Sequence, residues 1–256
     1  GWVGTVMDHQ AVDVAAMMAG IVGAEPGKYN YFAEMETAGK CFEWVKDHLV
    51  LDEVNVYLAK TDVAESRETV YESLYDYMSD TVAKVAPGSG GVLFTPWLHG
   101  NRCPFEDAAA AGMFFNLRLE TGKAQMLRAV LEGICFHLRW MLEVQEKKTK
   151  TSDPIRFVGG GALSPVTCQM LADITGRTIE TVENTKDVGA IGAAMLAAVG
   201  SGAFTSLSDA AKLVAVNGTY RPDPANKAVY DRNFRVFRKL YAANKENFAI
   251  LNRLEG

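Results

Sequence analysis

Residues 155–202, IRFVGGGALSPVTCQMLADITGRTIETVENTKDVGAIGAAMLAAVGSG, decide the fold of this chain. The pattern predicts a strand, a glycine turn, a helix, a second strand, a loop and a second helix. The first strand is expected at Pro154–Val158, an apolar run with β-branched and aromatic residues between proline and glycine. The second is expected at Thr178–Val182.

Three glycines, Gly159 to Gly161, follow the first strand directly. They permit positive φ angles and carry no Cβ that would block a ligand. Ser164 is expected to cap the next helix, with Pro165 in its first position and Gly176 at its end. Backbone N–H groups and the positive end of that helix would then suit a phosphate or a nucleotide.

A glycine turn of this kind has a simpler interpretation as a tight connection. It matches neither the P-loop nor the dinucleotide-binding pattern. A second helix rich in small residues is expected to begin at Asp187, and its glycines permit close approach of a ligand or of another helix. From Gly192 onward, helix packing is the preferred interpretation.

The glycine turn and both helices resemble a known family. GGGALSPVTCQMLADITGR (residues 159–177) and DVGAIGAAMLA (187–197) are similar to the nucleotide-binding segment of the FGGY family of carbohydrate kinases, above all its xylulokinase branch. The resemblance extends to three further segments in the family's order: LHGNRCPFEDAAAAGMFFNL (98–117), RAVLEGICFHL (128–138) and YRPDPANKAVYDRNFRVFRKLY (220–241).

The resemblance implies an α/β fold, the actin-like ATPase (ribonuclease H-like) domain that forms the C-terminal half of a two-domain sugar kinase. Residues 1–256 would be one C-terminal ATP-binding domain, truncated at its N-terminus, with the N-terminal sugar-binding domain absent. Gly1 would correspond to the last glycine of a GTSG-like turn of the family. The start without methionine fits either a processed chain or a piece of a longer one.

The resemblance also assigns the cofactor-binding residues. Gly160, Gly161 and Ala162, together with the preceding Gly159, are expected to flank the adenine. Ser164 and Pro165 are expected at the start of the helix. Gly39, in an AG-x-x-x-x-W segment, is expected to approach the phosphates. For Gly39, relief of packing at a helix start is an equally good interpretation. Lys40 is expected to be an exposed lysine or an added positive charge.

ATP and Mg²⁺ are the implied cofactors, and the implied reaction converts D-xylulose into xylulose 5-phosphate. The family's catalytic base and most of its Mg²⁺ ligands belong upstream, so no catalytic residue and no metal ligand are expected in this chain. Alone, it should transfer no phosphate. Its expected partners are ATP or ADP and, through the missing domain, the sugar; a homodimer is one option. A kinase of glycerol, gluconate or ribulose, or a non-catalytic nucleotide-binding module, are the alternatives.

Composition sets limits on the function. The 256 residues are 48% hydrophobic and 22% charged, typical of a globular protein with a sizeable core. A net charge of -5 gives no footprint for nucleic acid. No apolar run is long enough for a membrane span, and no stretch of basic residues followed by apolar ones predicts a signal peptide. Four isolated cysteines predict reduced thiols and a cytoplasmic protein, and nothing positions a Cys–His nucleophile pair.

The remaining segments are mostly predicted to be helical. A helix or a strand-to-helix crossover is expected at Asp8–Ile21, and a strand is expected at 91–96. Four further helices are expected, at Glu34–Val50, Arg67–Lys84, Gly122–Glu146 (with Thr121 as its cap) and Asn226–Leu254.

Two further predictions concern individual residues. Gly133 lies within the helix predicted at 122–146, which is apolar nearly all round, so a close neighbour or a ligand is expected to need its space. Arg102 is expected to pair with Glu106 or Asp107, and Asp107 to cap a helix over the alanines that follow it.

Overall fold

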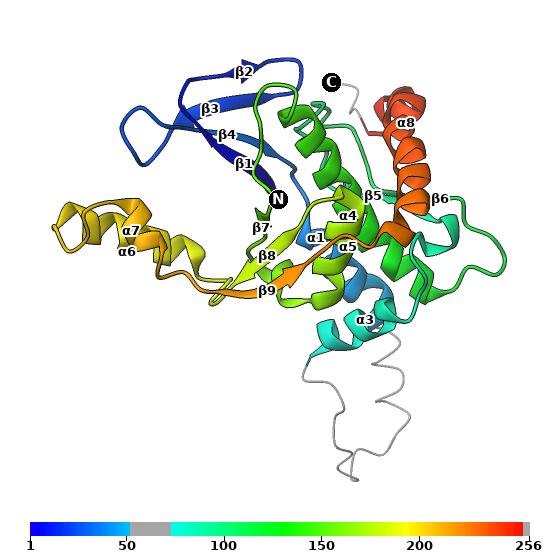
Figure 1. The fold of residues 1–256 in the computed structure, drawn as a ribbon. Helices are drawn as coiled ribbons and strands as arrows, with labels where there is room; N and C mark the ends of the chain where they lie inside the picture. Colours follow the sequence, from blue (N-terminus) through cyan, green and yellow to red (C-terminus); the bar gives the residue numbers. More distant parts are fainter. Residues whose placement is uncertain (52–72, 253–256) are drawn as a thin grey trace, which may run out of the picture.

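The fold combines helices with three small β-sheets, as Figure 1 shows. A computed structural model describes residues 1–51 and 73–252. Among these residues, no helix has both the length and the apolar content needed to cross a bilayer.

An antiparallel four-stranded sheet forms the N-terminal part of the chain, with strand order β1-β4-β3-β2. Its strands are β1 (Trp2–Met7), β2 (Val12–Asp13), β3 (Met18–Val22) and β4 (Tyr29–Glu34). The prediction of a helix or crossover at Asp8–Ile21 is therefore wrong. These residues form a hairpin in which β2 pairs with β3, and β3 also pairs with β4, which places Ala19 opposite Phe32; Met18 of β3 is buried.

Two smaller sheets follow. Strand β5 (Leu93–Thr95) pairs with β6 (Met113–Phe115), which confirms the strand predicted at 91–96. Strand β7 (Ile155–Arg156) runs parallel to β8 (Ile179–Val182), and β9 (Val216–Tyr220) is antiparallel to β8. Both strands predicted around the glycine turn are thus present, the first of them shorter than expected.

The longer helices lie close to their predicted positions. They are α1 (Gly39–Val45) with a π-helical turn at Lys46–Val50, α3 (Leu74–Ala83), α4 (Lys123–Gln145), α5 (Pro165–Thr175), α6 (Val188–Gly200), α7 (Leu207–Ala211) and α8 (Lys227–Asn252). Helix α1 begins later than predicted, because Glu34 belongs to β4. Residues 67–72 of the helix predicted at Arg67–Lys84 lie outside the described residues. The cap of α4 is Gly122, whereas Thr121 closes the preceding turn by accepting the N–H of Arg118.

Helix α4 forms the centre of the core, and 15 of its 23 residues are buried. It packs against α3, α5, α8 and β5. At Gly133 the helix touches β5 so closely that an added Cβ would lie 2.2 Å from the carbonyl oxygen of Phe94. The expected need for space at this glycine is confirmed, and the neighbour is a strand backbone.

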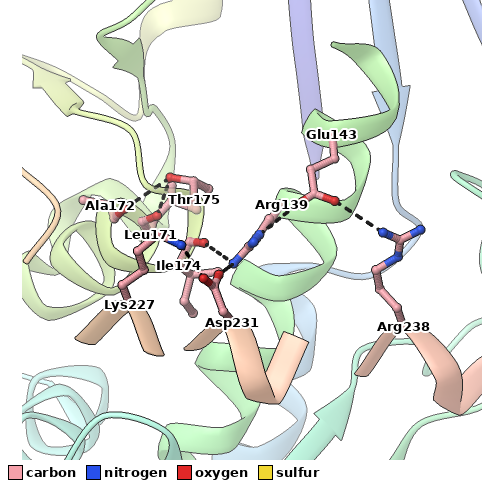
Figure 2. Close-up of polar contacts among 9 residues, drawn as sticks. All are labelled: Arg139, Glu143, Leu171, Ala172, Ile174, Thr175, Lys227, Asp231 and Arg238. Atoms are coloured by element: carbon pink, nitrogen blue, oxygen red, sulfur yellow. Dashed lines mark hydrogen bonds and ion pairs between the residues drawn. The ribbon is translucent and has the colours of Figure 1, made fainter. Parts of the chain in front are cut away.

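Polar contacts hold the C-terminal end of α5 between α4 and α8 (Figure 2). Arg139 of α4 donates to the carbonyl oxygen of Ile174 at 3.0 Å and to Asp231 of α8 at 2.8 Å. A cation at this end of α5 also meets the negative end of the helix dipole. Lys227 first and then Arg139 lower the pKa of Asp231. These contacts fix the helix whose other end carries the glycine turn.

Candidate functional site

The glycine turn is a well-anchored bend. Gly159 has φ +92°, in the region that favours glycine. Its N–H donates to the carbonyl oxygen of Thr185 at 2.9 Å and to Thr185 Oγ1 at 3.1 Å. A single 3₁₀ turn at Gly160–Leu163 then leads into α5. The loop after β8 therefore holds the start of the bend in place.

Ser164 and Pro165 occupy the first two positions predicted for α5. Ser164 Oγ accepts the N–H of Thr167 at 3.4 Å, the Ser164 carbonyl accepts that of Cys168 at 3.0 Å, and Pro165 has no N–H. Gly176 ends the helix in the left-handed conformation. The predicted caps are confirmed. The bonds at the start of α5 occupy most of the N–H groups that would otherwise be free to bind an anion. The bend consequently offers an uncovered backbone surface rather than a cluster of amide donors.

The residues of the bend differ in the space around them. Gly160 is exposed, and an added Cβ there would meet nothing within 4 Å. At Gly161, an added Cβ would lie 2.9 Å from Cζ of Phe157. Ala162 is 8% exposed and faces the core. The open side of the bend is therefore the backbone of Gly160, with Gly161 resting on an aromatic ring.

Gly39 is the first residue of α1, a short helix without a side-chain cap. It is exposed, and an added Cβ would meet nothing within 4 Å, so packing at the helix start does not require glycine. Lys40 forms an exposed ion pair with Glu43 at 2.6 Å. The described residues therefore do not support the alternative interpretation of Gly39, in which a glycine is needed to relieve packing at the helix start.

Helix α3 connects the two parts of the predicted site, which the sequence gave no reason to expect. Its Ser79 Oγ lies 3.4 Å from Ser164 Oγ, at the start of α5. Its Tyr75 ring lies 6.3 Å from that of Phe42 in α1, and the Lys46 ammonium sits 4.9 Å above the same tyrosine ring. The start of α5, directly after the bend, and the helix of Gly39 therefore both contact α3 through side chains; the three helices are seen in Figure 1.

Neither of the two cavities described coincides with this arrangement. One, of about 330 Å³, is lined by one side of α6 and by residues 183–184, 204 and 213–215, and the other, of about 370 Å³, is lined by Glu106–Ala109 and Asn252. Within residues 1–51 and 73–252, no group of three or more histidine, cysteine or acidic side chains could hold a metal ion.

The loop after β5 corrects two predictions. Arg102 pairs with Glu34 of β4 at 3.1 Å, not with Glu106 or Asp107. Asp107 accepts the N–H of Ala109 at 2.9 Å and the hydroxyl of Tyr241 at 3.1 Å, so it caps a turn and no helix follows. Both side chains hold the loop against other elements, because their partners are distant in sequence.

The geometry argues against a Cys–His nucleophile pair. His137 Nδ1 accepts the N–H of the Trp97 indole at 3.2 Å, so Nε2 carries the proton and donates to the carbonyl oxygen of Cys103 at 2.7 Å. Burial raises the pKa of the Cys103 thiol to about 12 and lowers that of His137 to about 4. A nucleophilic thiolate beside a basic imidazole needs the opposite shifts.

His137 should make the protein sensitive to mild acid. Its pKa is about 4 in the folded chain, against 6.5 for an ordinary histidine, so below pH 6.5 the unfolded chain binds more protons. Between pH 6.5 and 4 this difference should remove about 3 kcal/mol of the free energy of unfolding. Urea unfolding across this range should therefore show a steeper loss of stability for the wild type than for His137→Gln. Equal pH slopes would contradict the assignment, whatever the absolute stability of the variant.

Comparison with known proteins adds a family. The profile of the FGGY family of carbohydrate kinases, C-terminal domain, matches residues 3–201. The chain is 35% identical over 185 residues to a xylulose kinase of Lactococcus lactis, and 29% identical over 233 residues to a ribulokinase of Anoxybacillus flavithermus. These matches cover 70% and 88% of this chain, but 36% and 40% of the relatives.

A solved structure supports the fold. The ligand-bound xylulose kinase of Lactobacillus acidophilus superposes with a TM-score of 0.81 at 26% identity, over 97% of this chain and 46% of that protein. The predicted actin-like α/β fold is confirmed by this match. The chain spans less than half the length of the proteins it resembles.

Proposed function

Because the chain belongs to the FGGY family of carbohydrate kinases, we propose that it supplies the nucleotide-binding half of an ATP-dependent sugar kinase. In such a reaction the γ-phosphoryl group passes to a sugar hydroxyl, with Mg²⁺ to offset charge and a base to accept the hydroxyl proton. We assign the Mg²⁺ ligands and the base to the rest of the kinase, so the chain alone should transfer no phosphate.

The observation that carries this proposal is the open backbone of the glycine bend. Gly160 is exposed, an added Cβ there would meet nothing within 4 Å, and hydrogen bonds with Thr185 and the cap of α5 anchor the two ends of the bend. A flat ring such as adenine can lie against exposed backbone of this kind at van der Waals distance.

The bonds at the start of α5 suggest how the nucleotide would lie. Since Ser164 and Pro165 leave few N–H groups unsatisfied, this helix end is better suited to adenine and ribose than to phosphates. We assign the phosphates to the direction of Gly39, where the exposed start of α1 allows close approach. Helix α3 lies between the two regions, and Tyr75 and Ser79 are the side chains it would offer.

D-Xylulose is the proposed sugar, supported by the xylulose kinases among the relatives. Ribulose is the strongest alternative, since a ribulokinase matches a longer part of the chain at lower identity. Glycerol and gluconate kinases and a non-catalytic nucleotide-binding module remain further candidates. The cysteines at 41, 103, 135 and 168 are free and buried, which fits a reducing compartment, and we assign the protein to the cytoplasm.

Calorimetric titration of the chain with ATP tests the site. Gly160→Val should lower the affinity for ATP at least about tenfold, because its methyl groups would occupy the space proposed for adenine. The same change should leave the melting temperature unaltered, since an added Cβ meets nothing in the chain itself. Gly161→Val is a weaker test, because its side chain would displace Phe157.

Gly200→Val is the matched control, at another exposed glycine with open space around it. Its affinity for ATP should equal that of the wild type. Equal affinities in Gly160→Val and the control would place the nucleotide elsewhere, and a wild-type chain that binds neither ATP nor ADP would contradict the proposal as a whole.

A further inference from the structure

A buried pair of charges lies where α4 meets α3 and α8. Arg128 and Glu132 of α4 are both buried, and Arg128 Nε donates to Glu132 Oε1 at 2.7 Å. The Tyr230 hydroxyl of α8 accepts from the guanidinium at 2.8 Å and donates to the carboxylate at 3.2 Å. We call these three residues the buried triad. Apolar side chains of the same size would usually stabilise a core as well as a buried ion pair does, so stability alone does not explain the charges.

The arginine of the triad holds the C-terminal end of α3. Arg128 Nη1 donates to the carbonyl oxygen of Val85 at 2.8 Å and to that of Val82 at 3.2 Å. The last carbonyls of a helix have no partner within the helix itself, so the guanidinium satisfies them. Ser79, which touches Ser164 at the start of α5, lies about one turn before Val82. The arginine therefore fixes the helix that stands beside the glycine bend.

The glutamate of the triad holds an unusual turn at Gly88–Gly91. All four residues of this turn have positive φ angles, between +51° and +89°, and one of them is Ser89, although residues with a side chain rarely adopt such angles. The carboxylate of Glu132 accepts the Gly88 N–H and the Ser89 hydroxyl, each at 2.8 Å. These buried bonds stabilise a backbone conformation that would otherwise be unfavourable.

The turn at Gly88–Gly91 leads into the segment that supports Gly39. Strand β5 begins two residues after the turn, and Pro96 follows the strand directly. The Pro96 carbonyl oxygen accepts the hydroxyl of Thr37 at 2.6 Å, two residues before Gly39. The start of α1 is therefore held, through β5 and the turn, by the same pair of charges that holds α3.

We propose that Arg128, Glu132 and Tyr230 are positioning residues that set the separation between the two sides of the nucleotide site. This inference rests on the proposed function, in which Gly160 and Gly39 mark those two sides. Helix α3 makes the connection to the first side and β5 the connection to the second. Tyr230 makes α8 part of the arrangement, so a change in α8 should be felt as a change in the affinity for ATP.

Tyr230→Phe tests the proposal without removing a buried charge, because it deletes one hydroxyl and leaves the guanidinium and the carboxylate their other partners. Tyr241→Phe is the matched control. It also deletes a hydroxyl of α8 that donates to a carboxylate, that of Asp107 at 3.1 Å in the loop after β5. Each change removes a hydrogen bond, so each should lower the melting temperature by about 2–4 °C.

The two variants should differ in binding and in local exchange. In calorimetric titration of the 256-residue chain, well below its melting temperature, Tyr230→Phe should bind ATP about fivefold more weakly than the wild type. Tyr241→Phe should keep the wild-type affinity. Without ATP, hydrogen–deuterium exchange in α1 and at Gly88–Gly91 should be faster in Tyr230→Phe and unchanged in the control. A residue that only stabilised the fold would lower the melting temperature and alter neither measurement.

Equal affinities for ATP in Tyr230→Phe and Tyr241→Phe would overturn the proposal, and so would wild-type exchange of α1 in Tyr230→Phe. A wild-type chain that binds no ATP would instead contradict the proposed function. The exchange measurement uses no nucleotide, so faster exchange of α1 in Tyr230→Phe alone would still show that the buried triad positions this helix.

Discussion

Arg128→Met is expected to destabilise the chain by about 3–5 kcal/mol, the range typical of breaking a buried ion pair. Arg128 of α4 donates to Glu132 at 2.7 Å, and its side chain is 7% exposed while that of Glu132 is 1% exposed. The guanidinium also donates to the Tyr230 hydroxyl at 2.8 Å and to the carbonyl oxygen of Val85 at 2.8 Å. Methionine would leave the carboxylate buried without a counter-charge and the carbonyl without a donor.

The pH dependence of this loss follows from Glu132. Burial already raises its pKa, and Arg128 is the main opposing influence, so the variant should raise that pKa further. A carboxyl with a raised pKa in the folded state is destabilising above its unfolded pKa and harmless below it. The deficit of the variant should therefore shrink as the pH falls from 7 toward 4.5, the ordinary pKa of a glutamate, and should be largely gone below that pH. Urea unfolding at pH 7 and pH 4 measures both values.

Two further variants separate charge from packing. Adding Glu132→Gln to Arg128→Met should recover part of the stability at pH 7, because the unpaired charge is gone. Arg156→Met removes an arginine whose side chain is 52% exposed and 3.8 Å from Glu180, so it should change stability by less than about 1 kcal/mol. An Arg128→Met chain as stable as the Arg156→Met control would show that the buried pair contributes nothing.

Gly133→Ala should destabilise the chain nearly as much as Arg128→Met, although it adds only a single methyl group. Alanine normally stabilises a helix interior by about 1 kcal/mol relative to glycine. Here its Cβ would lie 2.2 Å from the carbonyl oxygen of Phe94 and 3.4 Å from the Phe94 Cβ. Because the obstacle is the backbone of β5, helix and strand must separate, and we expect a net loss of about 3 kcal/mol. Thermal and urea unfolding would both record it.

Gly192→Ala provides the control with identical chemistry. It lies in the interior of α6, where an added Cβ meets nothing within 4 Å, so its stability should equal or exceed that of the wild type. A Gly133→Ala chain that unfolds at the wild-type midpoint would mean that α4 and β5 are less tightly packed than described.

Local signals in the sequence predicted several elements closely. Ser164, Pro165 and Gly176 mark both ends of α5, because capping depends on residues within one turn of the helix end. The apolar periodicity of α4 and α8 predicted their lengths to within a few residues. The unusual glycine at position 133 also predicted a close neighbour, since a helix interior otherwise disfavours it.

Features that depend on distant partners were missed. The segment at Asp8–Ile21 carries an apolar pattern compatible with a helix, but it forms the β2–β3 hairpin, which pairs with the distant strand β4. Arg102 found its carboxylate at Glu34, 68 residues away, although acidic residues lay much closer in sequence. Ser79 received no role, because nothing near it indicates the contact with Ser164.

The sequence by itself determined the glycine bend, the helix that follows it and the family to which they belong, because each depends on neighbouring residues and their order. Only the tertiary structure decided that Gly160 is the open position, that Gly161 rests on Phe157 and that α3 joins the bend to the helix of Gly39. It also decided that α6 is left uncovered. The physical reason is that space around a residue is set by whichever segments pack against it, and these lie tens of residues away in the chain.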